Sequence, residues 1–315
     1  MRRKPSSLCL PLLAVLLTAA AEPKTALPPN EIVAMAQPGD WVDIAPDDLL
    51  VMTLTPASKG KPRRIVIQLM PAPFSAGWVD NIRLLARAHW YDGIAVVRVQ
   101  DNYVVQWGDP HGEDAKKAKP LPPGLKMMTE RDYVYPRSLP VDARLGTLLR
   151  PRNDVSHFAG FTEGFSFEGD GTPDSVRNWP VHCYGMVGVG RNLSPDTGTG
   201  AELYTVIGHA PRQLDRNIAL AGRIIEGMEH LASLPRGTGE IGFYKTPQER
   251  TPIRSIRLAS DLPAAEQPHV QYLDTGSDFF MRYADARANR RDPFFITPAG
   301  GADICNIPVP IRRKP

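Results

Sequence analysis

The sequence predicts a mainly β fold, on three observations. Residues 90–110 contain two short runs rich in Val and Tyr, 94–100 and 103–106, joined by the turn pair Asp101-Asn102. Such a pattern is typical of an antiparallel hairpin. Two further β-rich runs, 49–55 and 64–69, precede it. The 32 prolines among 315 residues are about twice ordinary usage, which argues against a helical bundle.

The side chains of the hairpin divide between two faces, because successive residues of a strand point to opposite sides. Strict alternation places Arg98 among apolar neighbours. The two expected faces are Ala95, Val97 and Val99 on one side and Ile94, Val96 and Arg98 on the other. On the second strand Val104 and Gln106 share a face, and Tyr103 stands at the turn. A guanidinium and a carboxamide beside aromatic and aliphatic groups indicate a surface that can bind a peptide.

Two segments have the spacing of helices. Residues 75–88 carry Val79, Ile82 and Leu85 three apart, with basic residues between them, which predicts a helix. Residues 277–290 begin with the capping residue Ser277 and carry aromatic residues at helical spacing, which predicts a C-terminal helix.

The N-terminus reads as a secretory signal peptide over residues 1–21, with cleavage expected after Ala21. Three basic residues at positions 2–4 precede a short apolar run, 8–17, and three alanines, 19–21. This is the order of a signal peptide, and the run is too short for a normal membrane span. We therefore expect a periplasmic or secreted protein without stable membrane insertion after cleavage. The alternative is an N-terminal membrane anchor that is not cleaved.

Cleavage would leave a formally neutral protein. The whole chain has 37 Lys and Arg against 34 Asp and Glu, and the segment removed contains three of the basic residues. A nucleic-acid partner is therefore not expected. Residues 22–45 are Pro-rich and polar, and we expect a tether or a strip laid over the domain.

Cleavage would also remove Cys9, leaving Cys183 and Cys305. Because an exported protein meets an oxidising environment, we expect these two to form a disulfide. Two separate buried thiols are the alternative.

Residues 98–110 resemble the core of the cyclophilin-type peptidyl-prolyl isomerases. That family carries an arginine and an aliphatic residue at a strand end, then a turn, an aromatic residue, two apolar positions, a glutamine and a Gly-Gly-Asp-Pro-like close. The corresponding residues are Arg98, Val99, Tyr103, Val104, Val105, Gln106, Trp107, Gly108, Asp109 and Pro110.

The resemblance extends over about residues 49–260, in the family's order. Matching segments are 181–190, 201–207, 220–228 and a last strand at 253–258. It implies a closed antiparallel β-barrel over 46–262 with two flanking helices, 75–88 and 226–234. Two segments have no counterpart in this resemblance. Residues 111–180 are expected to form a loop-like insertion that packs beside the substrate groove or covers the barrel. Residues 263–315 are expected to form an extension whose helix docks on the barrel.

The resemblance also implies the activity, cis-trans isomerisation of X-Pro bonds in client polypeptides, assisting the folding of exported proteins. The reaction requires no cofactor, since a donor aimed at the nitrogen of the twisted amide stabilises the transition state. Arg98 is the expected donor and Gln106 the group that holds a substrate carbonyl. Tyr103, Val104 and Tyr204 are expected around the proline ring, with Glu202 in the substrate-binding set.

Several positions depart from the family pattern. Gln213, Ile218 and Ala221 stand where the family has larger or polar pocket residues, Glu202 replaces a glutamine and Trp107 a glycine. A catalytically weak peptide-binding chaperone module of the same fold is therefore the second hypothesis, and a structural envelope domain the third. An acidic loop with Asp109 and Glu113 is typical of a solvated surface, so no metal site is expected.

Overall fold

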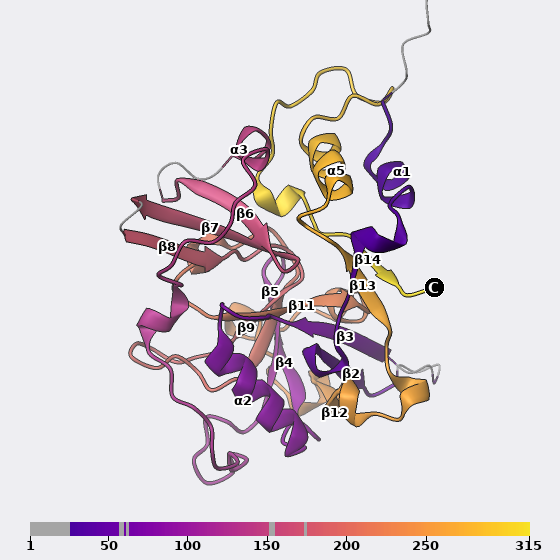
Figure 1. The fold of residues 1–315 in the computed structure, drawn as a ribbon. Helices are drawn as coiled ribbons and strands as arrows, with labels where there is room; N and C mark the ends of the chain where they lie inside the picture. Colours follow the sequence, from indigo (N-terminus) through magenta and orange to yellow (C-terminus); the bar gives the residue numbers. More distant parts are fainter. Residues whose placement is uncertain (1–25, 57–59, 61–62, 151–154, 173–174) are drawn as a thin grey trace, which may run out of the picture.

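An eight-stranded antiparallel barrel forms the larger part of the protein (Figure 1). The structure, a computed structural model, describes residues 26–56, 60, 63–150, 155–172 and 175–315. The expected signal peptide lies outside the described residues. The barrel closes in the order β10-β5-β4-β12-β2-β3-β11-β9. Its strands are β2 (Leu49–Leu54), β3 (Arg63–Leu69), β4 (Ala95–Val99), β5 (Val104–Gly108), β9 (Met186–Val189), β10 (Leu203–Val206), β11 (Leu220–Glu226) and β12 (Thr251–Leu258).

This barrel confirms the predicted fold class. The barrel strands expected from the sequence are present with slightly different bounds, and the helix predicted at 75–88 is α2 (Ala76–Arg87). The second flanking helix is shorter than expected: α4 spans only Glu229–Ala232, because Glu226 still belongs to β11. None of the described helices is long and apolar enough to cross a membrane.

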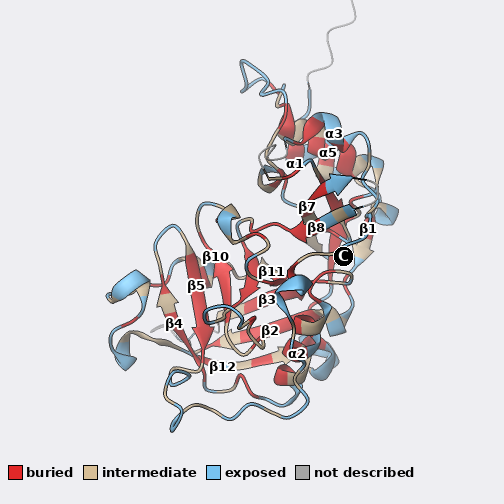
Figure 2. Cartoon of the chain, turned by 90° about the vertical axis from the view of Figure 1, so that its left-hand side faces the viewer, coloured by how far each residue is buried: buried red, intermediate tan, exposed pale blue. Residues whose placement is uncertain are grey.

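The apolar runs of β2 and β3 are continuous because both faces of these strands are covered. Leu50, Met52 and Leu54 point into the barrel core, where α2 also packs. Leu49 and Val51 point outward, under a second apolar layer formed with Val270 and Tyr272. Figure 2 shows the resulting burial along the barrel strands.

A β-bulge interrupts the alternation of β4. Val96 lies opposite Trp107, but Arg98 lies opposite Gln106, so Val97 is an extra residue. As a result Val96 and Val99 both enter the barrel core, whereas Arg98 faces outward with Gln106. The two expected faces were therefore wrong, because a bulge adds one residue to one strand of a pair and shifts the side chains that follow.

A three-stranded antiparallel sheet lies within the insertion, which was expected to be loop-like. Its strands are β6 (Phe158–Thr162), β7 (Phe165–Thr172) and β8 (Ser175–Pro180), in the order β6-β7-β8. Glycines hide the strand pattern here. Gly169, for example, leaves room for the ring of Phe158, since a Cβ would lie 2.3 Å from its Cζ atom.

This sheet belongs to a second lobe, which the two chain ends complete. The helices α1 (Pro29–Ala34), α3 (Leu145–Leu148) and α5 (Asp278–Ala288) lie together above the barrel (Figure 1). A third sheet joins β1 (Trp41–Asp43), β13 (Val270–Leu273) and β14 (Ile311–Arg313) in the order β1-β13-β14. Residues 26–45 thus contribute a helix and a strand rather than a loose tether.

The helix α5 begins at the predicted cap, where the hydroxyl of Ser277 accepts a hydrogen bond from the Phe280 N–H (3.1 Å). Its buried face joins a core shared with α1, α3 and the strands β6 and β8, so the expectation that it docks on the barrel was wrong. The reason is that the N-terminal segment and the insertion supply an apolar surface that covers it.

Candidate active site

Three neighbouring barrel strands place Arg98, Gln106 and Tyr204 in one row. Gln106 on β5 lies opposite Arg98 on β4 and opposite Tyr204 on β10. Because paired positions of an antiparallel sheet point to the same face, all three side chains lie on the outer surface of the barrel. The bulge at Val97 is what brings Arg98 to this face.

The polar side chains of this row form a hydrogen-bonded chain. The Nη1 atom of Arg98 donates to Gln106 Oε1 at 3.0 Å, and the amide of Gln106 donates onward to the carboxylate of Glu202. Arg98 also donates through Nε to the carbonyl of Ile241 at 2.8 Å and through Nη2 to Gln100. These contacts hold the guanidinium in one orientation.

Partial burial shapes the electrostatics of this chain. Burial lowers the pKa of Arg98, while nearby Tyr103 and Glu202 act in the opposite direction. Burial raises the pKa of Glu202, against the hydrogen bond from Gln106. The guanidinium carbon of Arg98 also lies 5.6 Å from the ring centre of Tyr103 and 5.3 Å from that of Phe243.

A small cavity of about 100 Å³ opens beside the row. It corresponds to roughly three waters' share of liquid volume, which suits one small side chain such as a proline ring. Its lining is Arg98, Tyr103, Val104, Gln106, Gly190, Arg191, Tyr204, Leu214 and Ile218. The structure thus gathers five of the six residues proposed from the sequence around one cavity.

Glu202 is the sixth, and it does not line this cavity. It stands behind Gln106 and lines a neighbouring cavity of about 280 Å³ that also contains Asp109 and Lys119. Its contact with the active-site row therefore passes through the carboxamide of Gln106.

Only one of the three departures suspected of reshaping the pocket touches it. Ile218 lines the cavity, whereas Gln213 is exposed to solvent and Ala221 is buried in the barrel core. Arg191 lines the cavity and was missed, because it follows β9 in a loop with no pattern of its own. Gly190 and Leu214 also line the cavity and were not among the proposed site residues.

Behind the cavity, Tyr204 is held by a buried histidine. Its hydroxyl lies 2.8 Å from Nε2 of His182, and Nδ1 of His182 lies 2.8 Å from Asp215 Oδ1. The carboxylate requires a donor, so Nδ1 carries the hydrogen and Nε2 accepts from Tyr204. Burial raises the pKa of Tyr204 well above its usual value, so the phenol stays neutral.

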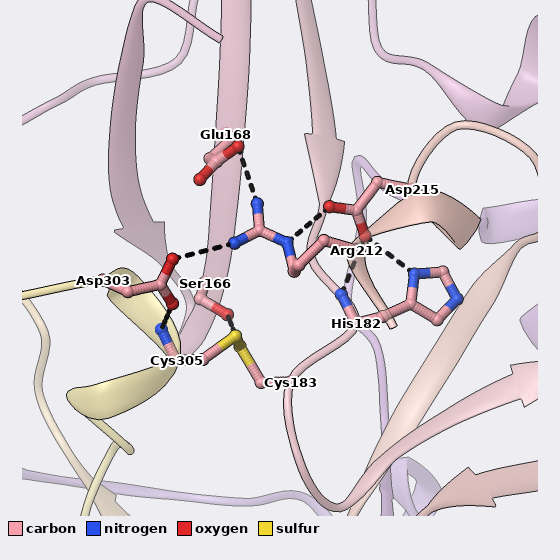
Figure 3. The surroundings of a disulfide bond; sticks show 8 residues. All are labelled: Ser166, Glu168, His182, Cys183, Arg212, Asp215, Asp303 and Cys305. Atoms are coloured by element: carbon pink, nitrogen blue, oxygen red, sulfur yellow. Dashed lines mark hydrogen bonds and ion pairs between the residues drawn. A yellow bond between two sulfur atoms is a disulfide. The ribbon is translucent and has the colours of Figure 1, made fainter. Parts of the chain in front are cut away.

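A buried ion network extends from this histidine into the second lobe (Figure 3). Arg212 donates to Asp215 at 2.7 Å and also reaches Glu168 of β7 at 2.7 Å and Asp303 at 3.2 Å. Burial alone would raise the pKa of Asp215, but the hydrogen bond from His182 and the charge and hydrogen bond of Arg212 outweigh it and lower the pKa.

The disulfide lies beside this network. Cys183 and Cys305 are bonded with an S–S distance of 2.04 Å and link the approach to β9 with the C-terminal extension, 122 residues away. Asp303 accepts a hydrogen bond from the backbone of Cys305 at 2.8 Å (Figure 3). The second lobe is thus joined to the wall of the pocket by a covalent bond and by ion pairs.

A model of the family described as cyclophilin type peptidyl-prolyl cis-trans isomerase/CLD matches residues 58–258, more than half of the chain. The chain belongs to the cyclophilin-type peptidyl-prolyl cis-trans isomerase family. Family membership and the enzyme class agree with the resemblance seen in residues 98–110. The family binds proline-containing peptides.

A solved cyclophilin structure shares the fold. The cyclophilin AquaCyp293 from Hirschia baltica is 21% identical, with a TM-score of 0.64 over 90% of this chain and 96% of that one. This cyclophilin likeness extends beyond the barrel. A Cryptosporidium parvum cyclophilin type isomerase, crystallised in the presence of the dipeptide ala-pro, is 12% identical, with a TM-score of 0.37 over 67% of this chain and 97% of that one. None of the curated proteins matches the chain.

Proposed function

We propose that this cyclophilin isomerises X-Pro bonds of exported proteins at the cavity lined by Arg98, with the Arg98 guanidinium as the transition-state donor. The observation that carries the proposal is the placement of Arg98, Gln106 and Tyr204 in one row around a cavity of about 100 Å³. A proline ring fits between Tyr103, Val104 and Tyr204, and its amide then lies beside the guanidinium.

The chemistry needs a donor and no proton transfer. Rotation about the amide has a barrier of about 18–20 kcal/mol because the C–N bond has partial double-bond character. In the twisted transition state the nitrogen regains its lone pair and accepts a hydrogen bond, which neither planar ground state does as well.

Arg98 retains hydrogens for this role. An arginine has five N–H donors. The bonds to Ile241, Gln106 and Gln100 use one hydrogen on each of its three nitrogens. Within the described contacts, one hydrogen on each terminal nitrogen is left for a substrate.

The test is a protease-free exchange measurement by NMR on a peptide containing Ala-Pro. We expect Arg98→Ala to lower the catalysed rate by roughly 100- to 1,000-fold, the usual effect of removing one donor from a transition state. Arg98→Lys should restore only part of the rate, since it keeps the charge but not the fork of donors. Arg254→Ala, at an exposed arginine of β12, is the matched control and should keep the rate.

Two outcomes would contradict this role. Equal rates for the wild type and Arg98→Ala would exclude Arg98 as the donor. Binding of the peptide without faster exchange by the wild type would favour the second hypothesis, a peptide-binding chaperone module.

The export of the protein rests on two supports. The first is the signal-peptide pattern at residues 1–21, and the second is the Cys183–Cys305 disulfide, since disulfides persist mainly in oxidising compartments. Mass spectrometry of the protein from its native cells should find Glu22 at the N-terminus and no free thiol. An intact Met1 with two reduced cysteines would contradict export.

A further inference from the structure

A third cavity, distinct from the two already described, lies between the barrel and the second lobe. Its volume is about 280 Å³. Strands β9 and β11 border it on one side, the β6–β7 hairpin on another, and the C-terminal extension closes it. Its walls are mainly apolar and include Phe161, Phe165, Ile224, Ile304 and Ile307, together with the Cys183–Cys305 disulfide.

Two arginines are the charged residues of this lining, Arg223 from β11 and Arg287 from α5, and the lining contains no Asp or Glu. Arg223 stacks on Phe165, with its guanidinium carbon 4.7 Å from the ring centre. Its Nε donates to the buried side chain of Gln68 at 2.9 Å. Its Nη2 atom is buried and has no hydrogen-bond partner among the described residues.

No carboxylate neutralises these arginines in the part of the chain that the structure describes. Glu226, on the same strand as Arg223, pairs instead with Arg313 at 2.7 Å. Glu163, beside the cavity-lining Gly164, accepts from the hydroxyl of Tyr272 at 3.3 Å. Burial lowers the pKa of Arg223 to about 10, which still leaves it charged at neutral pH.

Arg223 is partly buried, and its Nη2 atom has lost its water without gaining a hydrogen-bond partner among the described residues. Such a loss is unfavourable for a charged group. A guanidinium matches a carboxylate with two parallel hydrogen bonds. The apolar walls match a hydrocarbon chain, whose burial is favourable in proportion to its area. The cavity therefore combines the two parts of one ligand chemistry.

We propose that this cavity binds a medium-chain aliphatic carboxylate, with the carboxylate on Arg223 and the chain along the apolar walls. At one water's share of about 30 Å³ per heavy atom, 280 Å³ holds roughly nine heavy atoms. An eight-carbon acid is close to that size. A ligand of this kind enters between the barrel and the second lobe, so it is distinct from a polypeptide client.

The new site and the cavity beside Arg98, here called the proline pocket, lie at opposite ends of β9. Met186, the first residue of β9, lines the new cavity, whereas Gly190, just after its last residue, lines the proline pocket. The proposal therefore does not depend on the role of Arg98.

The test is isothermal titration of the full-length mature protein with octanoate, with 1-octanol as the uncharged control ligand. We expect octanoate to bind the wild type and Arg223→Met to weaken this binding at least tenfold, through loss of charge-assisted hydrogen bonds. Arg254→Met, at the exposed arginine of β12, should bind octanoate like the wild type. X-Pro exchange by Arg223→Met shows that the variant is folded.

Methyl NMR locates the ligand. Octanoate should shift the methyl signals of Ile224, Ile304 and Ile307 and leave those of Val104 in the proline pocket unchanged. If Arg223→Met does not fold, Val309→Trp serves instead: Val309 lines the cavity and is partly exposed, so the indole should block octanoate while Arg223 stays. The proposal is overturned if octanoate does not bind, binds Arg223→Met equally, binds no better than 1-octanol, or shifts Val104 alone.

Discussion

Arg98, Gln106 and Glu202 act as one hydrogen-bonded chain, so the role of each side chain depends on its neighbour. Of these three side chains, only the carboxamide of Gln106 both accepts and donates hydrogen bonds, so it can connect the guanidinium with the carboxylate. Glu202 orients Gln106 from behind, and Gln106 in turn orients Arg98. The sequence proposed all three as site residues; Arg98 and Gln106 line the cavity, whereas Glu202 stands outside it.

The carboxylate of Glu202 predicts a dependence of stability on pH. Burial raises its pKa above the unfolded value of about 4.3. The folded protein therefore holds the proton more tightly than the unfolded chain, and this carboxyl group lowers stability as pH rises through the folded pKa. Glu202→Gln cannot ionise at this position, and its amide oxygen can still accept the hydrogen bond from Gln106. The free energy of unfolding of the variant should therefore exceed that of the wild type by an amount that grows as pH rises.

Urea denaturation at about pH 4 and about pH 7 measures this difference, with Glu240→Gln at an exposed position as the control. We expect the advantage of Glu202→Gln to be larger at the higher pH. An advantage that is the same at both values, or larger at the lower one, would show that burial does not disfavour the charged form of Glu202.

The strand β4 and the helix α5 show how elements differ from their local pattern. In β4 the bulge at Val97 places both Val96 and Val99 in the core and turns Arg98 outward. In α5 the capping residue and the aromatic spacing were correctly identified, but the surface that the helix covers was not. Periodicity gives the type of an element, whereas its partner depends on residues far away in the chain.

The second core predicts the effect of a mutation in α5. Phe280 is fully buried there, with its ring 5.0 Å from that of Phe161. Phe280→Ala should lower the free energy of unfolding by about 3–5 kcal/mol, the cost of removing a buried aromatic side chain and leaving a cavity. Thermal or urea unfolding measures this loss.

Phe279 is the matched control, since it is the next residue of the same helix and is only partly buried. Phe279→Ala should lose clearly less stability than Phe280→Ala. Similar losses for both would mean that the buried face of α5 is not the one described, and X-Pro exchange should persist in both variants while they remain folded.

The whole molecule is a cyclophilin barrel with a second lobe assembled from three separate stretches of the chain. Residues 26–45, part of the insertion 111–180 and the C-terminal extension meet around one core. A disulfide and the ion network of Arg212 join this lobe to the wall of the Arg98 cavity. The Arg98 cavity and the cavity around Arg223 lie at the two ends of β9, close to this connection.

The local pattern of the sequence by itself determined the barrel strands, α2, the cap of α5 and the candidate residues Arg98, Gln106 and Tyr204. Strand and helix periods and the family's motif are properties of neighbouring residues, so they can be seen without a structure. Tertiary structure alone decided the bulge, which residues line the Arg98 cavity, the His182–Asp215–Arg212 network and the lack of a carboxylate partner for Arg223 among the described residues. Each of these depends on which distant residues come into contact and which charges lose their water, and no short stretch of sequence contains that information.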